Sequence, residues 1–117
     1  MGPFDLAERV ATPTTRVLEG SVPEGHPAFE GHFPGLPVLP GLAQLQGLVL
    51  GPARRAWPDL PALRAVRRLK FRRVVGPAMP LRVELTRTGP RRIAFAITSA
   101  DRPVAEGEME FGPEAQP

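Results

Sequence analysis

The sequence of 117 residues contains no cysteine and no tyrosine, and its single lysine stands beside 14 arginines. Without cysteine the chain can form neither a disulfide scaffold nor a thiolate metal or redox site, and we expect a cytoplasmic enzyme or binding module. No apolar run approaches the roughly 20 residues of a membrane-spanning helix, and the N-terminus lacks a secretion signal, so we expect no membrane association. Two histidines without cysteine or clustered carboxylates also predict that no metal is bound.

Positive charge is concentrated between Arg64 and Arg73, although the formal net charge is only +3. Such a basic segment raises the question of nucleic-acid binding. Single-stranded nucleic acids are held by aromatic side chains as well as by charge, and this segment contains only Phe71 for stacking. We therefore expect no nucleic-acid partner.

Alternation of apolar and polar residues predicts several short strands. The expected strands are Thr14–Ser21, Leu63–Arg73, Leu81–Thr86, Arg91–Ala100 and Ala105–Phe111, with a weaker one before Pro13. Tight turns rich in Gly, Pro and Asp separate the later strands. Short strands joined in this way predict an antiparallel sheet with one side facing solvent.

One segment, Gly41–Leu50, lacks this alternation and predicts a helix, since Gln44 and Gln46 are its only polar residues. Pro40 suits the first position of a helix. A helix that is apolar on nearly every side has to be buried, so the sheet should wrap around it. The fold class is therefore α+β, with five or six strands curled around one central helix.

The end of this helix is less defined. Pro52 lacks an N–H group and disfavours helical angles at Gly51, so the helix either ends near Leu50 or kinks into a short second piece ending at Trp57-Pro58. We expect one domain over residues 1–117, with a loose tail from residue 112 to residue 117.

A loop over residues 29–41 precedes the helix, and three prolines and three glycines fix its backbone. It presents His32, whose charge changes near neutral pH. The loop ends at a helix N-terminus, where free N–H groups and the positive end of the dipole can hold a carbonyl oxygen that gains negative charge. This combination suits proton abstraction beside a carbonyl, or acyl transfer. His26 lies outside the loop and is expected to be structural.

The sequence GHFPGLPVLPG at residues 31–41, followed by the apolar helix, resembles the active-site motif of the β-hydroxyacyl-[acyl-carrier-protein] dehydratases. These are hotdog-fold enzymes of fatty-acid synthesis and related pathways. Weaker similarities extend along the chain, at LKFRRVV from Leu69 and at PVAEG from Pro103. The helix start PGLAQL also resembles that of the dehydratase-like branch of aryl-polyene biosynthesis. The resemblance implies a hotdog fold.

Carried over by position, the resemblance implies that His32 is the general base that removes the α-proton of a 3-hydroxyacyl thioester. The N–H of Gly41 would stabilise the thioester oxygen, and the carbonyl of Val38 would orient the imidazole. The other residues implied to contact substrate are Phe33, Pro34, Gly35 and Pro40. The resemblance further implies a substrate carried by acyl carrier protein or CoA, no cofactor, and a homodimer or higher homo-oligomer.

The sequence departs from the family at the general acid, a Glu or Asp that lies 14 residues after the histidine and is Gln46 here. No Asp or Glu occurs between Gly41 and Trp57, and Leu50 replaces a glutamine that the family often carries. Glutamine can donate a hydrogen bond to a hydroxyl but cannot supply a proton. The resemblance thus implies a dehydratase in which Gln46 positions the hydroxyl or a water. Thioester hydrolysis, or an accessory subunit that binds acyl chains or carrier protein, are the alternatives.

Two further expectations concern polar side chains. The helical neighbours of Gln46 are Leu42, Val49 and Leu50, which predicts an apolar, buried setting for its amide. Gln44 lies about 200° away around the helix, so at most one of the two glutamines faces the site.

The resemblance also offers an explanation for the arginines. A hotdog sheet pairs its last strand with the strand after the helix, which predicts ion pairs of Glu106, Glu108 and Glu110 with Arg68, Lys70 and Arg72. Surplus arginines would attract an acidic carrier protein, and the candidates are Arg54, Arg55, Arg72 and Arg73.

Overall fold

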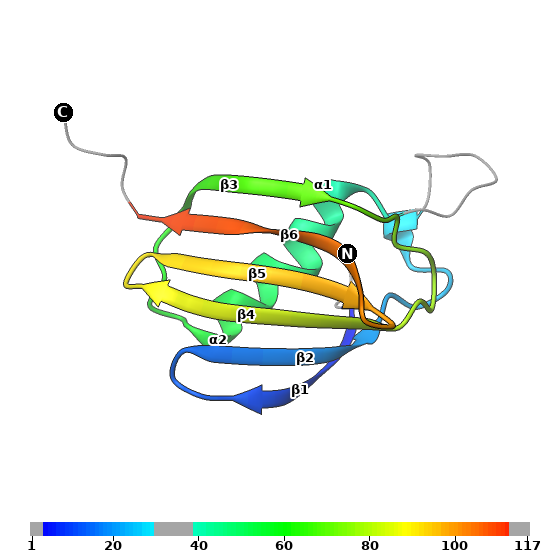
Figure 1. The fold of residues 1–117 in the computed structure, drawn as a ribbon, viewed down its shortest axis with the longest axis horizontal. Coiled ribbons are helices and arrows are strands. Elements are labelled where there is room, and N and C mark those ends of the chain that lie inside the picture. Colours follow the sequence, from blue (N-terminus) through cyan, green and yellow to red (C-terminus); the bar gives the residue numbers. More distant parts are fainter. Residues whose placement is uncertain (1–3, 30–38, 113–117) are drawn as a thin grey trace.

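The computed structural model describes residues 4–29 and 39–112, which form one antiparallel sheet crossed by one helix (Figure 1). The order of strands across the sheet is β1 (Asp5–Ala11), β2 (Thr15–Ser21), β4 (Leu81–Gly89), β5 (Arg92–Ser99), β6 (Arg102–Phe111) and β3 (Leu63–Phe71). All neighbouring strands are antiparallel. This confirms the expected α+β architecture, and β1 is the weak strand predicted before Pro13.

The core lies between the sheet and the helix behind it in Figure 1. The inward positions of β4 and β5 are buried apolar residues: Leu81, Val83, Leu85, Ile93, Phe95 and Ile97. The helix contributes Leu48 and Val49, both without solvent exposure. Burying a side chain of this size contributes about 1.5–3 kcal/mol to folding, so the alternating strands and the apolar helix hold each other in place.

The helix is continuous from Gly41 to Ala56, in three parts. These are α1 (Gly41–Gln44), the π-helical segment η2 (Leu45–Leu50) and α2 (Gly51–Ala56). The N–H of Gly51 donates to the carbonyl of Gln46, five residues earlier, and Pro52 follows at once. A π-helical turn accommodates the missing donor of Pro52 without ending the helix.

The prediction of non-helical angles at Gly51 was wrong, because this residue has φ −57° and ψ −55°. Glycine has no Cβ to crowd the following proline ring, so it tolerates this conformation better than other residues. The helix therefore reaches Ala56 and ends before Trp57, whose indole N–H donates to the carbonyl of Pro13 at 3.0 Å. No helix among the described residues is long and apolar enough to cross a membrane.

Several predicted boundaries need correction. Strand β4 extends to Gly89, and β6 already begins at Arg102. Strand β3 ends at Phe71 instead of Arg73, because the N–H groups of Arg72 and Arg73 both donate to the carbonyl of Val104, which interrupts the regular ladder. Gly112 is not part of a loose tail, since it is buried and donates its N–H to the carbonyl of Ala62. The rest of the predicted tail, residues 113–117, lies outside the described residues.

The outer face of the sheet carries two of the predicted ion pairs between β3 and β6, and its third glutamate has other arginine partners. Arg72 contacts Glu106 at 2.7 Å, and Arg68 contacts Glu108 at 3.9 Å. Glu110 is shared by Arg67 at 2.8 Å, Arg92 at 3.2 Å and Arg64 at 3.9 Å. Lys70 lies opposite Glu106 in the ladder. The arginine-rich segment is thus largely compensated by glutamates within the fold.

The shared carboxylate Glu110 should make stability depend on pH. A hydrogen bond from Arg67, together with the charges of Arg67, Arg92 and Arg64, lowers the pKa of Glu110 below its ordinary value of 4.5. Its stabilising contribution is therefore complete above pH 4.5 and is lost as the pH falls through the lower folded-state value. We expect Glu110→Gln to reduce the free energy of unfolding at neutral pH, and the difference from wild type to vanish in acid.

Urea unfolding of both proteins across the acid range measures this difference. The matched control is Glu108→Gln, which removes a single longer contact with Arg68 and should have a smaller effect at neutral pH. A Glu110→Gln penalty that persists unchanged into strong acid would contradict the ion-pair explanation.

Candidate functional site

Much of the predicted site loop lies outside the described residues. This applies to five of the residues assigned a role from the motif: His32, Phe33, Pro34, Gly35 and Val38. Their roles stay predictions. The structure describes the other part of the site, which is the end of the loop, the start of the helix and the segment that follows β3.

A cavity of about 370 Å³ lies where the helix begins. It is lined by Leu39, Pro40, Gly41, Gln44, Phe71, Arg72, Arg73 and Val74. The backbone anchors this corner, since the N–H of Leu39 donates to the carbonyl of Val75 at 2.8 Å. The structure thereby places the predicted oxyanion donor, Gly41, beside a cavity that β3 helps to form.

An aromatic ring closely approaches the helix start at Gly41. A Cβ on Gly41 would lie 2.9 Å from the Cζ atom of Phe71, which is too close for an unchanged ring position. The side chain of Phe71 is 46% exposed, so its ring also forms part of the cavity wall. The first N–H groups of a helix have no partner within the helix. The helix start can therefore present an N–H to a ligand oxygen, as predicted for Gly41.

The two glutamines occupy opposite environments, and the prediction of a buried amide at Gln46 was wrong. Gln46 is exposed, whereas Gln44 is only 3% exposed and lines the cavity. The side of the helix that carries Gln46 is open to solvent in the single chain, and Leu42 on this helix is also 67% exposed. We expected the sheet to wrap around the helix on nearly every side. In the structure the sheet covers one side of the helix, and the other side is exposed in the single chain.

The cavity carries positive charge at its edge. Arg72 and Arg73 both line it, and Arg72 also donates to Glu106. None of the described residues that line the cavity is a carboxylate. The described part of the site therefore offers hydrogen-bond donors, an amide and cations, but no group that could act as a carboxylic acid.

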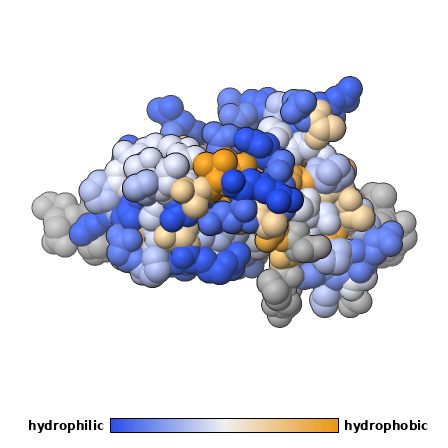
Figure 2. Space-filling model, turned by 90° about the horizontal axis from the view of Figure 1, so that it is seen from below, coloured by the Kyte–Doolittle hydropathy of each residue, from blue (hydrophilic) through white to orange (hydrophobic). Residues whose placement is uncertain are grey.

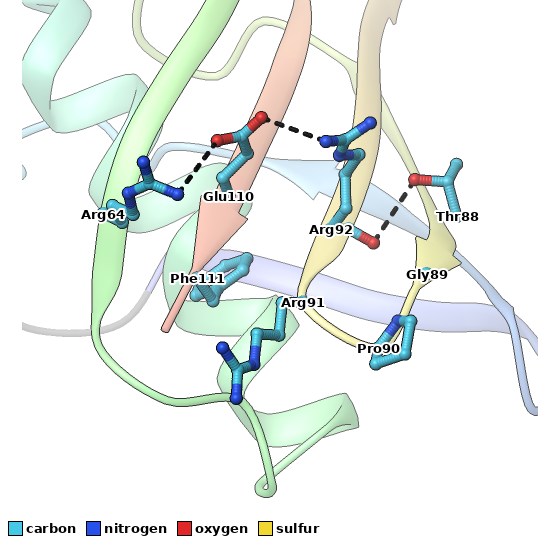
Figure 3. A pocket seen from close by; sticks show the side chains of 8 residues that line it. All are labelled: Arg64, Thr88, Gly89, Pro90, Arg91, Arg92, Glu110 and Phe111. Carbon is cyan, nitrogen blue, oxygen red and sulfur yellow. Dashed lines mark hydrogen bonds and ion pairs between the residues drawn. The ribbon is translucent and has the colours of Figure 1, made fainter. Parts of the chain in front are cut away.

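A second cavity, of about 440 Å³, lies at the opposite end of β3 (Figure 3). Its lining includes Arg64 and Arg92, which converge on Glu110 in Figure 3, together with the turn from Gly89 to Arg91. The described residues that were predicted for the site, Pro40, Gly41 and Gln46, are not part of its lining. The molecular face in Figure 2 is mostly hydrophilic, with a small hydrophobic area near its centre.

His26 occupies the structural position that was expected. It is buried, and its ring meets that of Phe4 edge-on, with centroids 4.8 Å apart. No group of three or more His, Cys, Asp or Glu side chains that could hold a metal ion occurs within residues 4–29 and 39–112.

Sequence reasoning did not identify Gln44 and Phe71 as residues of the site. The signal for Gln44 was present, because a glutamine about 200° from Gln46 must lie on the opposite side of the helix. No local signal marked Phe71, since its contact with Gly41 joins residues far apart in the chain.

Comparison with known proteins gives a consistent result. A family model described as ApeI dehydratase (ApeI-like) matches residues 8–108. The 3-hydroxyacyl-[acyl-carrier-protein] dehydratase FabZ of Syntrophotalea carbinolica is 31% identical over 130 residues, which cover 97% of this chain and 88% of that protein. The enzyme of the same name from Clostridium acetobutylicum is 36% identical over 93 residues, covering 71% and 66%.

Solved structures agree in fold. The dehydratase heterocomplex ApeI:P from Xenorhabdus doucetiae superimposes with a TM-score of 0.85 at 19% identity, covering 97% of this chain and 100% of that chain. Thioesterase superfamily member 2 from Mus musculus has a TM-score of 0.68 at 14% identity, covering 91% and 80%. These are hotdog folds, as expected from the motif. The chain belongs to the ApeI-like dehydratase family of hotdog-fold proteins.

Proposed function

We propose that this protein dehydrates 3-hydroxyacyl thioesters reversibly, with the acyl group carried by acyl carrier protein or CoA. His32 removes the α-proton, the N–H of Gly41 holds the thioester oxygen as it gains negative charge, and Gln46 positions the departing hydroxyl or a water. The observation that carries the proposal is the cavity at the helix start, which Gly41 lines at the end of the dehydratase-like motif. The protein is accordingly a hydro-lyase by family.

The same proposal includes a homodimer. Strand β3 lies at the edge of the sheet and leaves Leu63, Leu69 and Phe71 partly exposed. Leu42 and Val74, beside the cavity, are 67% and 66% exposed. Apolar side chains gathered at a sheet edge favour association with a second chain. Sedimentation at micromolar concentration tests this, and a monomer would contradict it.

The missing acid supports a second candidate, an accessory subunit. The helix Gly41–Ala56 contains no Asp or Glu, so the proton for the departing hydroxyl has to come from elsewhere. A different hotdog chain paired with this one could supply it. Such a subunit would bind acyl thioesters alone but turn them over only with its partner.

The deciding experiment uses the purified chain with 3-hydroxyacyl and enoyl thioesters of pantetheine. We expect interconversion of the two without release of free thiol. Thiol release would instead indicate a thioesterase, and binding without conversion would indicate the accessory subunit. Absence of both binding and conversion would overturn the proposal.

A further inference from the structure

A glutamine on the sheet-facing side of this helix stands out because it is a buried polar residue. Gln44 is only 3% exposed, and Leu48, one turn further along the helix, is completely buried. Buried amides need hydrogen-bond partners for both their oxygen and their nitrogen, and an unpaired atom lowers stability. A hydrophobic residue here would avoid that cost, so the amide at position 44 calls for a reason.

The nitrogen of the Gln44 amide has a hydrogen-bond partner. Its Nε2 atom donates to the carbonyl of Leu39 at 3.4 Å, and Leu39 is itself held by Val75. The Oε1 atom of Gln44 is the buried side-chain polar atom that has no hydrogen-bond partner among the described residues. The amide is thus oriented by a fixed carbonyl and leaves one acceptor without a donor.

The position of Gln44 in the fold relates this residue to the proposed reaction. Gln44 lines the same cavity as Gly41, three residues earlier on the helix. Residues three apart on a helix are neighbours, with Cβ positions about 5–6 Å apart. In a 3-hydroxyacyl thioester the hydroxyl-bearing carbon is two carbons from the thioester carbon. A thioester oxygen held at Gly41 therefore brings the hydroxyl within reach of the next turn, and a hydroxyl is a hydrogen-bond donor.

We propose that Oε1 of Gln44 accepts a hydrogen bond from the 3-hydroxyl group of the bound acyl thioester and thereby favours hydroxylated over saturated acyl chains. This inference rests on the proposed function. Gln44 accepts but does not protonate, so it leaves the oxygen lone pairs of the hydroxyl open to a second group. Because Gln44 and Gln46 lie on opposite sides of one helix, the Gln46 that positions the hydroxyl in the proposed function has to come from the second protomer of the homodimer. Gln44 is in this sense a specificity-determining residue.

The test compares 3-hydroxyoctanoyl-pantetheine with octanoyl-pantetheine, which lacks only the hydroxyl. Binding is measured by calorimetry in a His32→Ala background, so that turnover does not interfere. With Gln44 present, we expect the hydroxylated ligand to bind about tenfold more tightly, as one neutral hydrogen bond allows. In Gln44→Met the two ligands should bind with about equal affinity. The affinity for octanoyl-pantetheine should stay within about twofold of its value in the parent.

Leu48→Met is the matched control, because Leu48 lies on the same side of the helix and is not among the cavity residues. The Leu48→Met variant should keep the preference of about tenfold for the hydroxylated ligand that we expect in the parent. The Tm of Gln44→Met should stay close to that of the parent, because the bond to Leu39 is long and Oε1 has no bond to lose. A large fall in Tm would indicate a structural amide instead, and Gln44→Leu provides a second variant if the methionine variant does not fold.

Three results would overturn the inference. The preference for the hydroxylated ligand could persist in Gln44→Met, both ligands could lose affinity equally in that variant, or the parent could show no preference. These outcomes are separate from failure of the proposed function. If the wild-type chain makes no enoyl thioester, the proposed function fails. If it does make enoyl thioester, and substitution of Gln44 leaves the preference for the hydroxylated ligand unchanged, only the role of Gln44 is wrong.

Discussion

His32→Ala should lower kcat/KM for dehydration of a 3-hydroxyacyl thioester by about 10²–10⁴-fold, the usual contribution of a positioned acid or base. The α-proton of a thioester is weakly acidic, so its removal requires a base beside it while the carbonyl oxygen gains negative charge. Residual activity would come from the N–H groups at the helix start, which still stabilise that oxygen. Steady-state assay of the enoyl product measures the change.

His26→Ala is the matched control, since it removes the other histidine of the chain. His26 is buried against Phe4, so its loss should lower Tm while kcat of the folded protein stays within a few-fold of wild type. A His32→Ala variant with full activity would refute the assignment of the base. Circular dichroism must show that this variant is folded before a loss is interpreted.

Gln46→Glu should raise kcat by about 10²-fold or more, because it restores a carboxylic acid at the position where the family carries one. The exposure of Gln46 in the single chain matters here, since a carboxylate at this position pays no burial penalty and the variant should fold normally. The measurement is kcat for dehydration over a range of pH. Activity that depends on the new group should fall as that group loses its proton.

The same substitution at the other glutamine provides the control. Gln44→Glu replaces the buried donor to Leu39 by a carboxylate that would face the same carbonyl, so it should lower Tm and give no gain in kcat. A fall in activity for Gln46→Glu would show that the amide itself is adapted to the reaction. Such a result would contradict the view that the missing acid at position 46 limits the activity of this chain.

Local patterns were sufficient for most of the fold. The alternation of Leu81, Val83 and Leu85 with polar neighbours predicted a strand with one buried side, and the structure confirms it. Ion pairs between the β6 glutamates and basic residues of β3 were expected because a hotdog sheet places its last strand beside the strand after the helix, and two of them, Arg72 with Glu106 and Arg68 with Glu108, are present. These predictions succeeded because the period of two in a strand fixes which side each residue occupies.

Predictions failed where a residue's environment depends on distant contacts. Gly51 keeps helical angles because Gln46 accepts its N–H in a π-helical turn, and the presence of Pro52 alone did not indicate this. The environment of Gln46 was inferred from its helical neighbours, but burial depends on which side of the helix the sheet covers. The contact of Phe71 with Gly41 likewise follows from the sheet order, which places β3 at the edge near the helix start.

The edge strand β3 also bears on how copies of this protein can associate. Its register shifts between Arg67 and Lys70, and Arg68 between them has a left-handed backbone with φ 54°. A bulge of this kind breaks the row of backbone groups that another strand would pair with, and arginine side chains surround it. The edge can accept a partner along part of its length but is a poor template for continuous strand addition. The bulge therefore protects the chain from aggregating through the edge that it exposes.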